Sequence, residues 1–166
     1  MNIFLSQNTI TDSVKDLDDL RLQKQLVEVY QLLTLAIKEQ QEGHEIKAGH
    51  YHHPVYLYYK RNIPFLIGYG YECCKEYKYR FGKEHKLYMY FSCRERYLCS
   101  VTYIPFYMEG SKGQPNYIRT CDNVYALFQA KLCKKWDADK LKGREPRWTN
   151  RDVPEFYKKY LEGKND

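Results

Sequence analysis

The sequence predicts an all-α protein, a single compact domain spanning residues 1–166 in which about four to six helices pack around one core. Apolar residues recur every three or four positions along most of the chain, and prolines and glycines stand where these runs begin and end. The hydrophobic residues, 43% of the total, suffice for one core in a chain of 166 residues. No repeat or long linker divides the sequence.

The first predicted helix is the longest and runs from Thr11 or Asp12 through about Gln41. Gly43 follows its end, where a glycine readily adopts the left-handed backbone that closes a helix. Helical spacing is clearest in its apolar positions Leu22, Leu26, Val29, Leu33 and Ile37.

Two prolines predict the next two helices. Pro54 and Pro64 are each well placed in a first helical turn, where the missing N–H costs nothing. We therefore expect helices over residues 54–62 and 64–81, the second closed by Gly82.

The second half of the chain alternates helical and turn-rich sequence. A helical stretch is expected over about residues 84–98, followed by a turn-rich segment, 102–120, with two prolines and two glycines. This segment is a candidate functional loop. A helix beginning at Asp122 is predicted from the apolar positions Val124, Leu127, Phe128, Leu132 and Trp136, and a short helix from residues 154–163.

Composition narrows the function classes. The formal charge of +6 and the pI of about 8.9 favour a polyanionic partner. The N-terminal sequence lacks the features of an export signal, and no segment has the length of a membrane span. We therefore expect a cytoplasmic protein, in the host cytoplasm if the protein is phage-encoded. We also expect a monomer. Six cysteines without a CxxC pair favour reduced thiols. We predict no metal and no cofactor, since the histidine spacing fits no standard ligand set (His44, His50, His52 and His53).

Four polar residues border the apolar stripe of the first helix. At ~100° per residue, Asp18, Arg21, Gln25 and Glu28 fall within an arc of roughly 80°. A carboxylate at the edge of a core loses hydration, which raises its pKa and suits it to acid–base chemistry. Glu28 is the best such candidate. The alternative is a structural network in which Arg21 pairs with Asp18 and Gln25.

Aromatic residues alternate with basic ones in two stretches, YLYYKR and KEYKYRFGKEHKLYMY, within a chain that holds 18 tyrosines. Such surfaces can contact phosphates and stack on bases. The alternative is that most of these tyrosines pack at helix interfaces.

The order of the motifs resembles the phage pyrimidine-dimer DNA glycosylase family, also called endonuclease V. The long helix carries Leu17, Asp19 and, eleven residues after the leucine, Glu28. HHPVYLYYKRNIPFLIGYGYECCKEYKYRFG is similar to the family's second long region. YIP, ALFQAKLCKK and REPRWTN resemble its loop, its last core helix and its C-terminal proline–tryptophan segment.

The resemblance implies a compact helical repair enzyme that cuts the glycosidic bond of an altered base and then nicks the strand. The family's nucleophile is the N-terminal amine, which forms a Schiff base with the sugar, and Glu28 matches the glutamate that moves protons. Glu28, Met1 and Asn2 are therefore the catalytic candidates. An α-amine suits this role because its pKa lies near 8, whereas that of lysine starts near 10.4.

This sequence departs from the family pattern at several positions. Asn2 disfavours removal of Met1, and Val27 and Gln31 replace two arginines that grip DNA. Lys24 can substitute as the amine only if its pKa is lowered. The predicted substrate- and DNA-binding residues are Asp18, Arg21, Lys24, Gln25, His52, His53, Lys134, Arg144, Arg147 and Trp148.

The predicted function is excision of a damaged or modified base from DNA, with strand nicking through the N-terminal amine as a second step. Two alternatives remain. One is a monofunctional base or nucleotide hydrolase in which Glu28 activates water. The other is a phage accessory protein that binds nucleic acid without catalysis.

Overall fold

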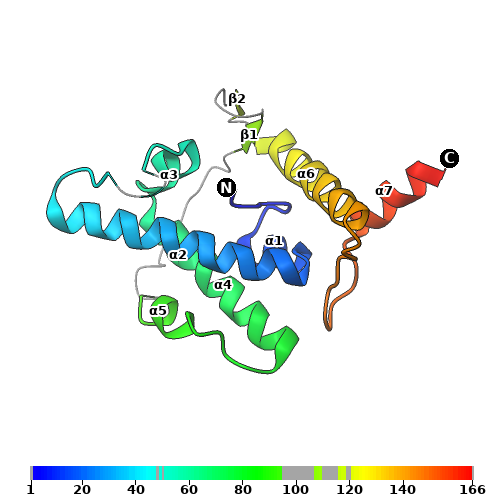
Figure 1. Cartoon of the computed structure of the whole chain (residues 1–166), viewed down its shortest axis with the longest axis horizontal. Coiled ribbons are helices and arrows are strands. Elements are labelled where there is room, and N and C mark those ends of the chain that lie inside the picture. The colour runs from blue at the N-terminus through cyan, green and yellow to red at the C-terminus, as the bar shows by residue number, and fades with distance from the viewer. Residues whose placement is uncertain are drawn as a thin grey trace.

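The computed structural model describes residues 2–47, 49, 51–94, 107–109, 116–118 and 121–165 (Figure 1). Within these residues the predicted all-α fold class is confirmed, with seven helices and one hairpin of two three-residue strands. The elements are α1 (Ile10–Asp16), α2 (Asp19–Glu42), α3 (Pro54–Tyr59), α4 (Ile63–Phe81), α5 (Tyr88–Ser92), β1 (Tyr107–Glu109), β2 (Asn116–Ile118), α6 (Cys121–Leu141) and α7 (Glu155–Asn165).

The single long helix predicted over about residues 11–41 is wrong, because the chain breaks it into α1 and α2. Leu17 ends α1 with an extended backbone and is fully buried, and Asp18 continues extended before α2 begins. The Asp18 carboxylate accepts a hydrogen bond of 2.7 Å from the indole N–H of Trp136. That partner lies 118 residues away, so local periodicity could not reveal the break.

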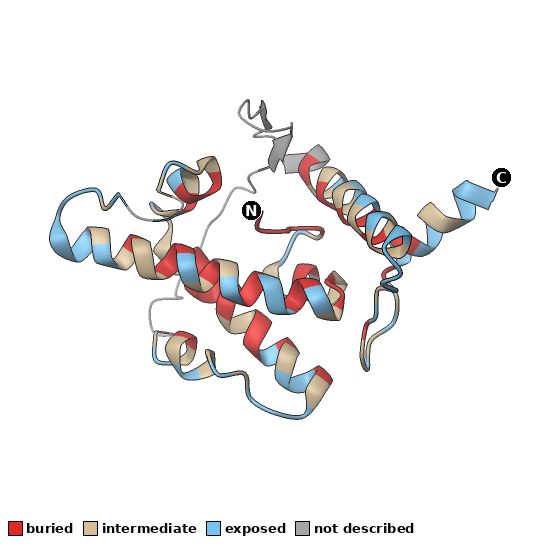
Figure 2. Ribbon diagram, in the orientation of Figure 1, coloured by how far each residue is buried: buried red, intermediate tan, exposed pale blue. Residues whose placement is uncertain are grey.

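The long helices α2 and α4 pack against each other at the centre of the molecule. Buried residues gather where the two helices cross in Figure 2. Gly43 and Gly82 end these helices in the left-handed conformation, with φ of 73° and 68°, as the sequence predicts. The two helices contribute twelve of the 28 buried hydrophobic residues in the described part of the chain.

A close approach at Gly70 seats α5 on α4. A Cβ atom built on Gly70 would lie 2.1 Å from the buried ring of Phe91, so only glycine leaves room for this ring. The helical stretch expected over residues 84–98 is described up to residue 94, and α5 occupies only its middle. The turn-rich segment 102–120 falls largely outside the described residues, apart from the paired strands β1 and β2.

The segment before α1 is buried without pairing into a sheet. Ile3, Phe4 and Leu5 are at most 4% exposed and belong to the common core. Tyr69 of α4 donates its hydroxyl to the Phe4 carbonyl at 2.8 Å, and Gln129 of α6 donates to the Ser6 carbonyl at 2.7 Å. The segment is therefore held between α4 and α6 by its own main chain.

A buried ionic network joins α4 to the segment after α6. Arg80, which has no exposed side-chain surface, donates to Glu76 at 2.8 Å and to Asp19 at 3.0 Å. Arg151 binds both oxygens of Glu76 at 2.9 Å, and the Thr149 hydroxyl donates to Asp19 at 2.6 Å. This network gives Asp19 a clear structural role at the start of α2.

Aromatic packing completes the C-terminal part. Trp136 of α6 lies 4.9 Å from Trp148 and 4.7 Å from Tyr157 of α7, measured between ring centroids. The helices predicted from Asp122 and over 154–163 correspond to α6 and α7.

Candidate active site

Glu28 lies in the middle of α2, half-buried beside the N-terminal segment. Its Oε2 accepts a hydrogen bond of 3.1 Å from the Gln25 amide, and the main-chain N–H of Asn2 also donates to the carboxylate. The carboxylate thus sits at the edge of the core with two neutral donors. Fixed donors of this kind orient a carboxylate without neutralising its charge.

Gln25 is the residue that joins Glu28 to the N-terminal segment. It is 1% exposed, and its Oε1 accepts from the Phe4 N–H at 3.1 Å and from the Tyr69 hydroxyl at 3.0 Å. Its Nε2 donates to the Asn2 carbonyl at 2.7 Å as well as to Glu28. A single buried amide therefore sets the position of the N-terminal main chain relative to the carboxylate.

Opposing effects act on the pKa of Glu28. Burial raises the pKa above its ordinary value of 4.5. The amino-terminal charge, the Asn2 N–H and the charges of Lys135 and Lys24 oppose this without cancelling it. Glu28 consequently holds its proton to a higher pH than an exposed glutamate, which suits a group that both gives and takes protons.

The charge of Lys135 on α6 also acts on Glu28, and we name Asn2, Gln25, Glu28 and Lys135 the Glu28 cluster. Burial lowers the pKa of Lys135, and the charge of Arg21 lowers it further, in spite of Glu28. The sequence did not single out Lys135 as a site residue. Its position directly before the buried Trp136 was the available signal that its stem lies at the core edge.

Asp18 and Arg21 form a second arrangement, about two to three helical turns before Glu28. Arg21 lies 3.3 Å from Asp18 and also pairs with Asp139 of α6. Burial raises the pKa of Asp18 despite its bonds to Trp136 and Arg21, whereas the bond from Arg21 lowers that of Asp139. The structural network expected around Arg21 thus includes Asp18, but its other partner is Asp139 rather than Gln25.

The remaining predicted binding residues are dispersed. Lys24, Lys134, Arg144 and Arg147 are exposed, the first on α2 and the others on or after α6. Their side chains are available to an external polyanion.

The two histidines and the tryptophan lie in other surroundings. His53 caps α3 by accepting from the Val55 N–H at 3.2 Å, and His52 is exposed against Tyr51. Trp148 is 9% exposed and donates to the Asp16 carbonyl at 2.9 Å. Its ring therefore packs within the protein in this structure.

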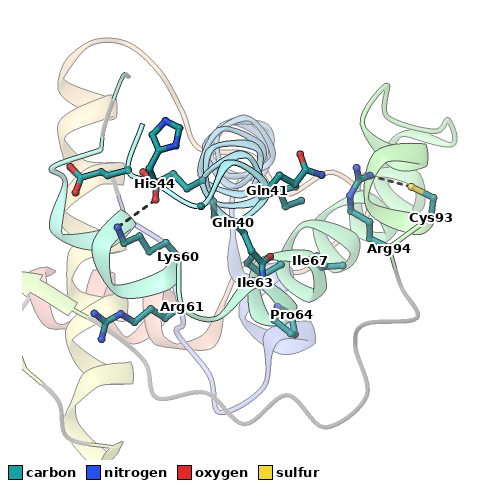
Figure 3. Close-up of a pocket in the computed structure, with 15 residues that line it drawn as sticks. Gln40, Gln41, His44, Lys60, Arg61, Ile63, Pro64, Ile67, Cys93 and Arg94 are labelled. Atoms are coloured by element: carbon teal, nitrogen blue, oxygen red, sulfur yellow. Dashed lines mark hydrogen bonds and ion pairs between the residues drawn. The ribbon is translucent and has the colours of Figure 1, made fainter. Parts of the chain in front are cut away.

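A separate cavity of about 1130 Å³ lies at the far end of α2. Figure 3 shows it bordered by Lys60 and Arg61, with Arg94 at its other side. Lys60 donates to Glu39 at 3.4 Å. Its nearest lining residue on α2, Ala36, is eight positions beyond Glu28, roughly 12 Å along the helix, and no member of the Glu28 cluster lines it.

The described residues contain no group of three or more His, Cys, Asp or Glu side chains placed to hold a metal ion, although His50 lies outside them. No described helix is long and apolar enough to cross a membrane. Free thiols are present at Cys73, Cys74, Cys93 and Cys133.

Comparison with known families gives one match. A family model described as pyrimidine dimer DNA glycosylase matches residues 1–89, the part of the chain that runs from the N-terminal segment into α5. No curated protein and no solved structure matches the chain.

Proposed function

The chain belongs to the pyrimidine dimer DNA glycosylase family, and we propose that it releases a damaged or modified base from DNA with Glu28 as its acid–base residue. Family membership follows from a match to 89 of the 166 residues. The observation that carries the proposal is the half-buried Glu28 carboxylate, held by Gln25 and Asn2 with a raised pKa.

Base release makes specific demands on such a carboxylate. As the glycosidic bond breaks, its electron pair leaves with the base and positive charge develops on the sugar. An ionised Glu28 stabilises that charge, and a protonated Glu28 gives its proton to the leaving base. Because burial raises the pKa of Glu28, a larger share of this carboxyl is protonated at a given pH than for an exposed glutamate, and the ionised form can take a proton back.

Strand nicking, as the second step that we propose, requires an amine at the same site. The amine bonds to C1′ and forms a Schiff base, after which loss of a proton from C2′ expels the 3′ phosphate. Ionised Glu28 is the base for that proton. The family resemblance gives the amine to the N-terminus, at Met1 or, after its removal, at Asn2.

Four exposed cations fit a DNA partner. Lys24 on α2 and Lys134 on α6 are exposed, and Arg144 and Arg147 follow α6. Arginine and lysine contacts to phosphates position a duplex without reading its sequence. We propose these four side chains as phosphate contacts.

The test is a panel of oligonucleotides that each carry one altered base, including a pyrimidine dimer. We expect wild-type protein to release at least one of these bases, and Glu28→Gln to reduce that rate by about 10²–10⁴-fold, the usual contribution of general acid–base catalysis. Glu42→Gln, the same change at an exposed position of α2, is the matched control. DNA binding and helix content should be unchanged in both variants.

Two results would contradict the proposal. Wild-type rates in the Glu28→Gln variant would remove Glu28 from catalysis. Binding of altered DNA by the wild-type protein without release of any base would favour the non-catalytic accessory protein instead.

A further inference from the structure

The cavity at the far end of α2 takes no part in the proposed function. Its volume of about 1130 Å³ is large enough for a small organic ligand, since typical ligand pockets measure ~300–1,000 Å³. Its apolar lining includes Ile37 on α2 and Ile63, Pro64 and Ile67 at the start of α4. A flat apolar body can therefore be buried against this lining.

Most charged residues around the cavity are either paired or exposed. Lys60 lies 3.4 Å from Glu39, which also accepts from the Ile46 N–H at 3.1 Å. The charges of this pair are balanced within the protein. Glu45 and Arg61 are exposed to water. None of these four residues places a shielded, unbalanced charge in the cavity.

Arg94 is the exception. It is half-buried at the other side of the cavity and forms no ion pair with a carboxylate among the described residues (Figure 3). Its Nη1 donates to the Tyr90 carbonyl at 2.6 Å and to the Cys93 Sγ at 3.2 Å, and its guanidinium carbon lies 3.9 Å from the centroid of the Tyr90 ring. The Tyr90 ring packs in turn on Tyr30 of α2, with 4.8 Å between the centroids. These contacts orient the guanidinium without balancing its charge.

The free edge of Arg94 suits an anion. Both of its hydrogen bonds within the described chain involve Nη1, so the Nε and Nη2 donors remain for a ligand. Two such N–H groups match two oxygens of a phosphate. Because the guanidinium is partly shielded from water, it attracts an anion more strongly than an exposed cation does.

Gln40 and Gln41 add neutral polar groups at the end of α2. Both side chains are exposed at the cavity, and neither makes a hydrogen bond within the part of the chain that the structure describes. An amide offers a donor and an acceptor, the combination that pairs with the edge of a nucleobase. A fatty acid would match Arg94 and the apolar lining, but it would leave both amides unused.

We propose that this cavity binds a nucleotide, with its phosphate on Arg94, its base against the apolar lining and the edge of the base toward Gln40 and Gln41. The ligand chemistry is a 5′-phosphorylated nucleoside, which is either a free mononucleotide or the 5′-phosphorylated end of a DNA strand. The site shares no residue with the Glu28 cluster and begins roughly 12 Å from Glu28 along α2. It therefore goes beyond the proposed function and does not depend on it.

Isothermal titration calorimetry of the full chain with dAMP, deoxyadenosine and inorganic phosphate tests this site. We expect dAMP to bind at least about 10-fold more tightly than either fragment, because each fragment lacks one set of contacts. Arg94→Gln should weaken dAMP binding by about 10- to 100-fold and leave deoxyadenosine binding unchanged. Gln40→Leu should weaken dAMP binding and leave phosphate binding unchanged. Lys159→Gln, which removes a positive charge at an exposed position of α7, is the matched control.

Competition with single-stranded oligonucleotides separates the two sources of the nucleotide. If the ligand is a strand end, an oligonucleotide with a 5′-phosphate displaces dAMP and the same strand with a 5′-hydroxyl does not. If the ligand is a free mononucleotide, neither strand displaces dAMP. Equal displacement by both strands would instead indicate general DNA binding and would overturn the proposal.

Three further results would overturn it. They are no binding of dAMP at millimolar concentration, equal affinities for dAMP and inorganic phosphate, and unchanged dAMP affinity in both Arg94→Gln and Gln40→Leu. Circular dichroism separates loss of a contact from loss of the fold, and Gln40→Leu carries the test if Arg94→Gln does not fold. Binding of dAMP without release of any altered base would reject only the proposed function, whereas base release without dAMP binding would reject only this site.

Discussion

Replacement of Gln25 by leucine should destabilise the protein far more than its small change in volume suggests. The side chain makes four hydrogen bonds at 1% exposure, to Asn2, Phe4, Glu28 and Tyr69. Leucine fills a similar volume, so the cost of a cavity is small. The variant therefore isolates the loss of hydrogen bonds.

The magnitude follows from which groups lose their partner. The Tyr69 hydroxyl retains the Phe4 carbonyl at 2.8 Å, and half-buried Glu28 retains the Asn2 N–H. The Phe4 N–H and the Asn2 carbonyl lose the bonds of 3.1 and 2.7 Å that Gln25 provides. At about 1–3 kcal/mol for each buried group left unsatisfied, the free energy of unfolding should fall by about 2–6 kcal/mol.

Urea unfolding followed by far-ultraviolet circular dichroism measures this change. The transition midpoint should move to lower urea with an unchanged slope. Gln23→Leu, at an exposed position of the same helix, should change stability by no more than about 0.5 kcal/mol. If Gln25→Leu were as stable as Gln23→Leu, the idea that this amide anchors the N-terminal segment would be refuted.

Two further predictions concern the packing and the ionic network of α4. Gly70→Ala forces a methyl group against the ring of Phe91 and should lower the free energy of unfolding by about 1–3 kcal/mol. Gly163→Ala in α7, where nothing lies within 4 Å, should leave this free energy unchanged or raise it by up to about 1 kcal/mol. Equal shifts in the melting temperatures of the two variants would contradict this prediction. Burial raises the pKa of Glu76, but Arg80 and Arg151 lower it by more, so the pKa lies below its ordinary 4.5. The ionised carboxylate therefore stabilises the folded protein above pH 4.5. This contribution to stability is lost as the pH falls through the lower pKa of the folded state. The stability difference between wild type and Glu76→Gln should therefore shrink below pH 4.5, and urea titrations across pH that show a constant difference would disprove it.

Local patterns in the sequence predicted the elements better than their junctions. Gly43 and Gly82 end their helices because a left-handed residue satisfies the last carbonyls of a helix locally. The break before α2 depends instead on Trp136, which holds Asp18 from α6. A helix end fixed by a residue more than a hundred positions away leaves no trace in the periodicity of either segment.

The candidate site was predictable on α2 and not on α6. The polar arc of Asp18, Arg21, Gln25 and Glu28 lies beside the apolar stripe, as its spacing indicates, with the first three buried and Glu28 half-buried. Which neighbour each of them meets is a property of tertiary packing. Lys135 shows the consequence. It directly precedes the buried Trp136, which signals a position at the edge of the core, but the sequence does not show which side chains it meets there.

The residues of the polar arc have two different surroundings. This difference explains why Glu28, and not Asp18, is suited to acid–base chemistry. Asp18 and Arg21 are satisfied by partners from α6, so their charges are committed to holding that helix. Glu28 meets neutral donors from Gln25 and Asn2, which fix its geometry and leave its proton exchangeable. The family match covers residues 1–89, which contain Gln25 and Asn2, the donors to Glu28 in the described part of the chain. The acid–base residue that we propose and its two described donors therefore belong to the part of the chain that the family model covers.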